Sequence, residues 1–214
     1  NSFGCTDTVT QQILVYPNIS SQFGIIPNDS GCHAFTVSFF STSVGADTFL
    51  WDFGDGPPVV NDSNPTHTYF NPDTIADSIY SVQLTVISQY GCKDSIRDTV
   101  VVHPQPIASF TVSDSLVTAP FVVTITNSST GAVSYFWNFG DGDTTTKTDT
   151  NSFTHLYTNT TDSIVRYTLC LTAETNFGCK NTSCITIIVN PQLRQRLIWF
   201  PMIQVVIRLR FSFL

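Results

Sequence analysis

The feature that most constrains this chain is a repeat with a period of 87 residues. Gly4, Gly91 and Gly178 stand at this interval, and each is followed at once by a cysteine and 13 residues later by a proline. Several markers that keep one spacing twice indicate a true repeat, and a period well above about 50 residues is that of a whole domain rather than of a solenoid unit. The chain of 214 residues is therefore expected to hold two complete domains, at 18–103 and 105–190.

The first part of the chain lies outside these complete units. Residues 1–16 match the end of each unit, and we expect them to be the last strand of a truncated preceding repeat. Pro17, Pro104 and Pro191 mark the joints, because proline stiffens a junction and cannot donate to a β-ladder. Joints this short predict domains in close succession.

Residues 191–214 break with the repeat. After Pro191 the sequence becomes basic and apolar, with no period-two alternation. Read one base out of frame, its codons permit Val-Pro-Asn-Asp-Ser-Gly-Cys, which matches Ile26–Cys32 at the spacing that the repeat requires. We interpret this segment as a non-domain tail, the frameshifted start of the next repeat. An amphipathic tail on a membrane surface is the alternative.

Within each complete unit, apolar and polar residues alternate with a period of two, as in half-buried strands. The segments Tyr80–Val86 and Tyr167–Ala173 show this most clearly. Each unit contains about seven such short segments separated by turn residues, with Trp51 or Trp137 on a middle one. The pattern predicts an all-β fold of tandem immunoglobulin-like β-sandwiches of about seven strands each, with both tryptophans in the core.

One motif recurs in both units. The segments Trp51-Asp-Phe-Gly-Asp-Gly56 and Trp137-Asn-Phe-Gly-Asp-Gly142 are each followed by His-x-Tyr and then by Tyr-x-Val/Leu-x-Leu-Thr. This combination resembles the PKD (polycystic kidney disease) domain, as found in tandem in bacterial surface proteins of the type IX secretion system. The resemblance implies an extracellular, bacterial, PKD-type sandwich that spaces or presents other modules. The structural residues that carry it are Trp51, Asp52, Gly54, Asp55, Gly56, His67, Tyr69, Trp137, Gly140, Asp141, Gly142, His155 and Tyr157.

Four aspartates cluster near the two signature turns and invite a calcium site. They are Asp52, Asp55, Asp141 and Asp143. Hard cations take carboxylate oxygens as ligands, but Asp-Gly sequences are equally typical of tight turns. The second unit has Asn138 where the first has Asp52, which argues against a shared metal site. We therefore expect no cofactor, with calcium as the alternative.

The recurring histidines do not indicate catalysis. His67 and His155 occupy the same place in both units, and neither has a nucleophile at a fixed spacing, such as a Gly-x-Ser-x-Gly elbow. A residue that recurs in every repeat is more often part of the scaffold. The sequence therefore predicts a protein that is not an enzyme.

Charge and hydropathy exclude two classes of partner. The net charge is −7, and the last 21 residues hold four of the nine basic side chains, which leaves five against 16 acidic ones in the body of the chain. Such a surface repels phosphate backbones, so we expect no nucleic-acid binding. No run of about 18 apolar residues is present, so we expect no membrane span. The expected partners are neighbouring repeats of the same chain, and extracellular proteins or polysaccharides.

Six cysteines without a Cys-x-x-Cys pair indicate disulfides and an oxidising, extracellular or cell-surface location. We predict a Cys32–Cys92 disulfide, from the start of one strand to the turn before the last. We also predict Cys170–Cys184, because these residues replace Gln83 and Arg97, which should face each other across a hairpin. Cys5 and Cys179 would remain unpaired.

These features favour a non-enzymatic structural or adhesive repeat of a large secreted or cell-surface protein, which acts as a rigid spacer and interaction module. The alternative is an accessory domain pair of a secreted hydrolase that binds polysaccharide or protein.

Overall fold

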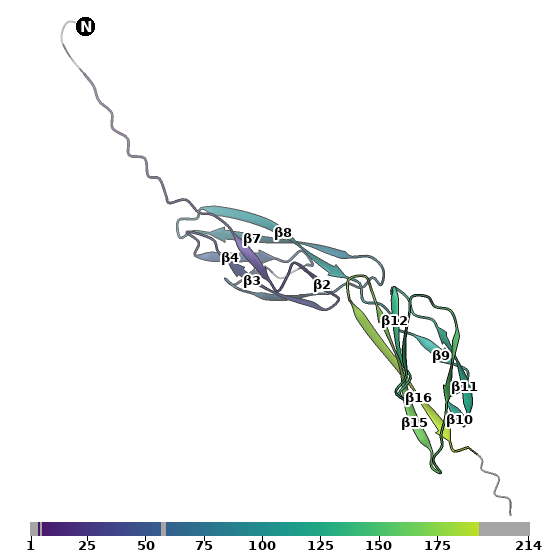
Figure 1. Cartoon of the computed structure of the whole chain (residues 1–214). Helices are drawn as coiled ribbons and strands as arrows, with labels where there is room; N and C mark the ends of the chain where they lie inside the picture. Colours follow the sequence, from purple (N-terminus) through teal and green to yellow (C-terminus); the bar gives the residue numbers. More distant parts are fainter. Residues whose placement is uncertain (1–3, 5, 57–58, 193–214) are drawn as a thin grey trace, which may run out of the picture.

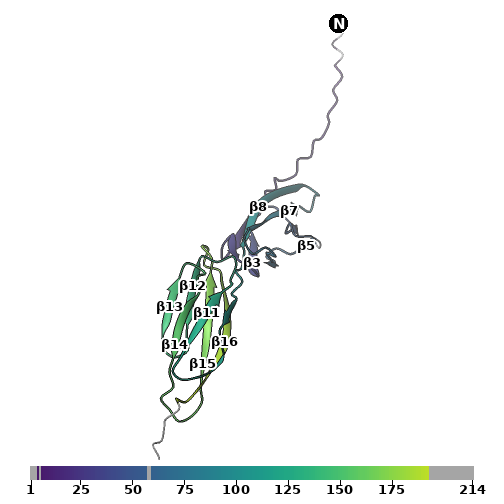
Figure 2. The ribbon, with the colours of Figure 1, turned by 90° about the vertical axis from the view of Figure 1, so that its right-hand side faces the viewer.

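The computed structural model describes residues 4, 6–56 and 59–192, and shows two β-sandwiches placed end to end (Figures 1 and 2). Domain 1 contains eight strands: β1 (Phe23–Ile26), β2 (Ser30–Cys32), β3 (Phe35–Ser41), β4 (Thr48–Asp52), β5 (Val60–Asn61), β6 (Thr66–Tyr69), β7 (Ser78–Ile87) and β8 (Lys93–His103). Domain 2 repeats them as β9 (Phe110–Val112), β10 (Leu116–Thr118), β11 (Phe121–Asn127), β12 (Ser134–Asn138), β13 (Thr144–Lys147), β14 (Phe153–Tyr157), β15 (Val165–Glu174) and β16 (Lys180–Asn190). The described residues form no helix, and so none that could cross a membrane.

Both domains have the same topology. A three-stranded sheet, β1-β3-β6 or β9-β11-β14, packs on a five-stranded sheet, β2-β8-β7-β4-β5 or β10-β16-β15-β12-β13. The first edge of each sandwich is divided between the two sheets, because β1 joins the small sheet and β2 then pairs in parallel with the end of β8. This division gives eight short strands where the sequence indicated about seven.

Residues 6–16 form no strand and are exposed. A strand needs a ladder partner, and the other strands of the preceding repeat expected from the sequence are not in this chain. The segment 193–214, interpreted above as a frameshifted start of a repeat, lies outside the described residues.

The alternating segments bury the residues that the sequence assigned to the core. Val82, Leu84 and Val86 of β7 are fully buried, as are the matching residues of β15, Leu169, Leu171 and Ala173. Trp51 on β4 and Trp137 on β12 are also inaccessible to solvent, and each contacts the rings of neighbouring phenylalanines. The two cores are separate clusters, so each sandwich has its own apolar interior.

The tyrosines of the His-x-Tyr motif tie the two sheets together. The Tyr69 hydroxyl donates to the carbonyl oxygen of Phe53 at 3.2 Å, and the Tyr157 hydroxyl donates to that of Phe139 at 3.0 Å. Both rings are fully buried, and this burial is the main reason that the pKa of each phenol is held well above its usual range. The hydroxyls therefore act as neutral donors at every physiological pH.

Replacing Tyr157 with phenylalanine should lower the free energy of unfolding of domain 2 by about 1 to 3 kcal/mol, because a buried carbonyl loses its donor while the ring stays in place. Urea unfolding would measure this, with Tyr90→Phe as a control at an exposed tyrosine. An unchanged unfolding midpoint for Tyr157→Phe would show that the Phe139 carbonyl finds another donor.

Candidate functional site at the domain junction

The signature turns form a recurring aspartate–histidine pair. Asp55 Oδ2 lies 2.7 Å from Nε2 of His67, and Asp141 Oδ2 lies 2.7 Å from Nε2 of His155. Each imidazole also stacks on the phenylalanine of its motif, with ring centroids 4.2 Å apart in domain 1 and 3.8 Å apart in domain 2. The pair holds the signature turn against strand β6 or β14, which is a scaffold role.

The carboxylates considered as calcium ligands take part in the local turns. Asp52 Oδ1 accepts a hydrogen bond from the backbone N–H of Gly54 at 3.0 Å. Asp141 Oδ1 accepts one from the N–H of Asp143 at 3.1 Å, while its other oxygen contacts His155. Asp141, Asp143 and His155 lie close enough to share an ion, with ligand atoms within 4.8 Å of one another. The sequence of domain 1 has Pro57 in place of Asp143, so this group of three is not a feature of the repeat.

A buried asparagine two residues after each motif tyrosine is a structural residue that the sequence analysis missed. The amide nitrogen of Asn159 donates to the carbonyls of Ser163 and Val189, each at 2.8 Å, and its oxygen accepts from the N–H of Thr161. Asn71 makes the same three bonds in domain 1. The signal was present, because both motifs read His-x-Tyr-x-Asn.

One of the two disulfides joins the expected partners, and the other does not. Cys170 and Cys184 are bonded across the β15–β16 hairpin, as predicted, at a Cα–Cα distance of 4.1 Å. The predicted Cys32–Cys92 bond is wrong: Cys32 is bonded to Cys179 of domain 2, with a Cα–Cα distance of 5.5 Å. Cys92 forms no disulfide within the described part of the chain, and Cys5 lies outside that part.

The reason for this correction is the direction of β2. Because β2 pairs in parallel with β8, Cys32 lies beside His103, at the end of β8, whereas Cys92 precedes its first residue. The 11 residues of β8 separate the two cysteines by roughly 36 Å at about 3.3 Å per residue. Cys32 therefore stands at the far end of domain 1, next to the β15–β16 turn of domain 2 that holds Cys179.

Noncovalent contacts surround this disulfide. The imidazole of His103 stacks on the ring of Phe177, with centroids 3.8 Å apart and planes 4° from parallel. Its Nδ1 lies 2.9 Å from Oδ1 of Asp77, and Gln105 in the linker donates to the carbonyl of Lys180 at 3.1 Å. Each group comes from a segment that the repeat places at the end of a domain, so the junction is built by the fold itself.

In each domain, a side chain on the last strand binds the backbone at the start of the domain. This side chain is a carboxylate in domain 1 and a neutral amide in domain 2. In domain 1 the carboxylate of Asp94 accepts hydrogen bonds from the N–H and the hydroxyl of Ser21, at 2.7 and 2.9 Å, and the backbone bond above all holds the pKa of Asp94 below its usual range. In domain 2 the amide oxygen of Asn181 accepts from the N–H of Ala108 at 3.0 Å. The same fastening is thus ionisable in one domain and neutral in the other.

Replacing Asp94 with asparagine should make domain 1 less sensitive to acid. The pKa of Asp94 is lower in the folded chain, so its contribution to stability is present above the ordinary pKa of 3.8 and is lost as the pH falls through the folded value. The gap in stability between wild type and Asp94→Asn should therefore close on acidification. Urea unfolding from pH 7 to pH 2.5 would measure this, and a gap independent of pH would contradict it.

The two sandwiches, the Trp-x-Phe-Gly-Asp-Gly turns and the junction define a tandem of extracellular-type immunoglobulin-like modules. The chain belongs to the PKD domain family: the family model matches it twice, at residues 27–104 and 103–189.

The chain is also similar to parts of several solved structures. The PKD1 domain of the Vibrio cholerae metalloprotease PrtV is 27% identical, with 38% of this chain and 93% of that chain covered and a TM-score of 0.31. The PKD1 domain of Vibrio anguillarum Epp is 26% identical, with 41% and 95% covered and a TM-score of 0.32. A Ca²⁺-stabilised adhesin that helps an Antarctic bacterium bind ice is 16% identical, with 83% and 50% covered and a TM-score of 0.37. Among curated proteins, no match was found.

Proposed function

We propose that this chain is a non-enzymatic spacer from a large bacterial protein that is secreted or held at the cell surface. Its PKD domains would hold a distal binding or catalytic module at a distance from its anchor. The observation that carries the proposal is the Cys32–Cys179 disulfide, because it bonds two separately folded domains to each other rather than stabilising either one.

The contacts at the junction favour a rigid rod over two domains that move independently. The short linker, the covalent bond and the His103–Phe177 stack restrict both bending and twisting between the domains. Disulfides persist in oxidising compartments, which supports an extracellular location. The polar groups of the signature turns bind one another, which supports a scaffold without catalysis or a cofactor.

Small-angle X-ray scattering of the full chain would test the spacer role. We expect one extended arrangement to fit the data, unchanged between buffer with calcium and buffer with EDTA. A profile that required a broad range of interdomain angles would contradict the proposal.

Co-sedimentation with insoluble polysaccharides and protein fibres would test the alternative function. Specific binding in this assay would favour an accessory domain pair of a secreted hydrolase.

A further inference from the structure

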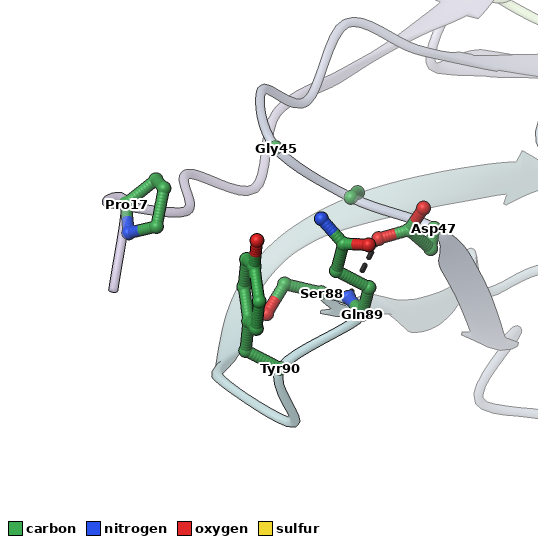
Figure 3. Close-up of a pocket in the computed structure, with 7 residues that line it drawn as sticks. Pro17, Gly45, Asp47, Ser88, Gln89 and Tyr90 are labelled. Carbon is green, nitrogen blue, oxygen red and sulfur yellow. Dashed lines mark hydrogen bonds between the residues drawn. The ribbon is translucent and has the colours of Figure 1, made fainter. Parts of the chain in front are cut away.

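Each domain has a hollow at its N-terminal end, and the two hollows are equivalent. In domain 2 the hollow is lined by Pro104, Gly131 and Phe177, among others, and Ile75 reaches it from domain 1. In domain 1 the equivalent hollow is lined by Pro17, Gly45 and Tyr90, all from domain 1 and its own linker. Figure 3 shows Pro17 and Gly45 on one side of it and the Ser88–Tyr90 turn on the other.

The domain 1–domain 2 junction shows what this hollow receives. A Cβ atom at Gly131 would collide with the carbonyl oxygen of Thr74, so the loop of domain 1 that holds Thr74 and Ile75 lies directly against the rim of the hollow. Gly45 occupies the same place on the rim in domain 1. A Cβ atom at Gly45 would lie 3.0 Å from the carbonyl oxygen of Asn18, in the linker of domain 1 itself, where the matching atom at Gly131 meets a loop of another domain.

A second feature of the junction is repeated beside this hollow. Tyr16 stacks on Tyr90 with ring centroids 4.6 Å apart and planes 20° from parallel. These residues precede His103 and Phe177, the pair that stacks at the domain 1–domain 2 junction, by 87 positions each. The linker before domain 1 thus enters along the same path as the linker before domain 2.

The third feature is the thiol of Cys92. It sits in the β7–β8 turn, 87 positions before Cys179, and is half-buried. In domain 2 the cysteine at this place is bonded to the end of β2 in the domain before it. Cys92 lacks such a partner within the described residues, although its N–H donates to the Ser88 hydroxyl as that of Cys179 donates to the Thr175 hydroxyl.

We propose that the hollow at Pro17, Gly45 and Tyr90, together with Cys92, is a socket for the far end of a preceding PKD repeat. The occupant would resemble domain 1: it carries a cysteine at the end of its β2 strand, which bonds to Cys92, and a loop like Thr74–Ile75, which covers the hollow. The two thiols lose two protons and two electrons to a small-molecule or protein disulfide, which is reduced to thiols. The inference rests on the proposed function as a stacked spacer.

The C-terminal end of domain 2 lacks both features that the occupant needs, the cysteine and the loop. Thr118 pairs with the last residue of β16 as Cys32 pairs with the last residue of β8, so the cysteine is missing. The loop after Asn159 is also one residue shorter than the loop after Asn71. Asn159 bonds to the carbonyl of Ser163, four residues on, whereas Asn71 bonds to that of Ala76, five residues on. The disulfide-linked junction therefore requires a repeat of the domain 1 type on its N-terminal side.

A three-domain chain tests the socket. Residues 18–104 are duplicated in the full chain, which keeps the 87-residue spacing, with Cys5→Ser throughout and Cys92→Ser in the upstream copy. After oxidation with glutathione disulfide, non-reducing peptide mapping should find a Cys32–Cys92 bond between the copies beside Cys32–Cys179, with loss of Cys92 alkylation by iodoacetamide. The control adds Cys32→Ser in the upstream copy, which should abolish the new bond and restore alkylation.

Three results would overturn the proposal. The first is a folded three-domain chain, with Cys32–Cys179 formed, in which Cys92 stays open to alkylation. The second is a chain that fails to form Cys32–Cys179, since compatible domain ends should stack without disturbing the next junction. The third is scrambled pairing that is equal in test and control. If Cys92 stays free while the chain still scatters as one rod, the socket is wrong and the spacer function stands.

Discussion

Replacing Cys32 and Cys179 together with serine should release the fixed angle between the two sandwiches while both remain folded. Each domain has its own buried core, so neither needs the disulfide for its interior. The bond does, however, limit the freedom of the chain when one domain unfolds beside the other. The Cys32–Cys179 bond closes a sequence separation of 147 residues. In the chain-entropy model, closing such a loop contributes about 4 to 5 kcal/mol, and the variant should lose up to that amount of stability.

Two measurements separate the effects of this change. Calorimetry should show the transitions of the two domains moving to lower temperature and apart from each other. Amide ¹⁵N relaxation should show one tumbling body in the wild type and two in the variant, because the His103–Phe177 stack alone is a weak constraint.

The matched control is Cys170→Ser with Cys184→Ser. This disulfide lies within one hairpin and closes a sequence separation of 14 residues, so its loss should cost domain 2 about 3 kcal/mol without loosening the junction. Identical tumbling of the Cys32/Cys179 variant and the wild type would show that noncovalent contacts fix the angle, and the disulfide would lose its place in the spacer proposal.

Replacing Asn159 with alanine should destabilise domain 2 by about 2 to 5 kcal/mol. The side chain is 3% exposed, and its amide is the donor to the carbonyls of both Ser163 and Val189. Truncation removes this donor from the buried carbonyl of Val189, at about 1 to 3 kcal/mol, and also removes one donor from the Ser163 carbonyl and the acceptor of the Thr161 N–H, at about 1 kcal/mol each. Urea unfolding followed by tryptophan fluorescence would measure the loss, since Trp137 reports on this core.

Asn159→Asp makes the test sharper. Aspartate keeps the size and the acceptor for the N–H of Thr161 but replaces the donor with a carboxylate facing two carbonyls, so it should be at least as destabilising as alanine. Asn151→Ala, at an exposed position, is the control, and Asn71→Ala should reproduce the effect in domain 1. Equal stability of Asn159→Asp and wild type would refute the role of the amide.

The sequence by itself determined the fold class, the family and the residues of both cores. These depend on short-range patterns: the period-two alternation of β7 and β15 fixes which side chains turn inward, and a strict 87-residue spacing repeats the result. The same reasoning found Cys170–Cys184, because the hairpin register that places Gln83 opposite Arg97 also places these cysteines opposite each other.

Only the tertiary structure decided the partner of Cys32 and the role of Asn159. The position of Cys32 depends on the parallel pairing of β2 with β8, which brings together segments about 70 residues apart and leaves no periodic signal. Asn159 stands in an Asn-x-Thr triplet that reads as a surface glycosylation site, yet it is buried, because its bonding partners come from a different strand and loop. Local periodicity fixes which face of a strand is buried, whereas contacts between strand ends and between domains depend on how the whole chain is arranged in space.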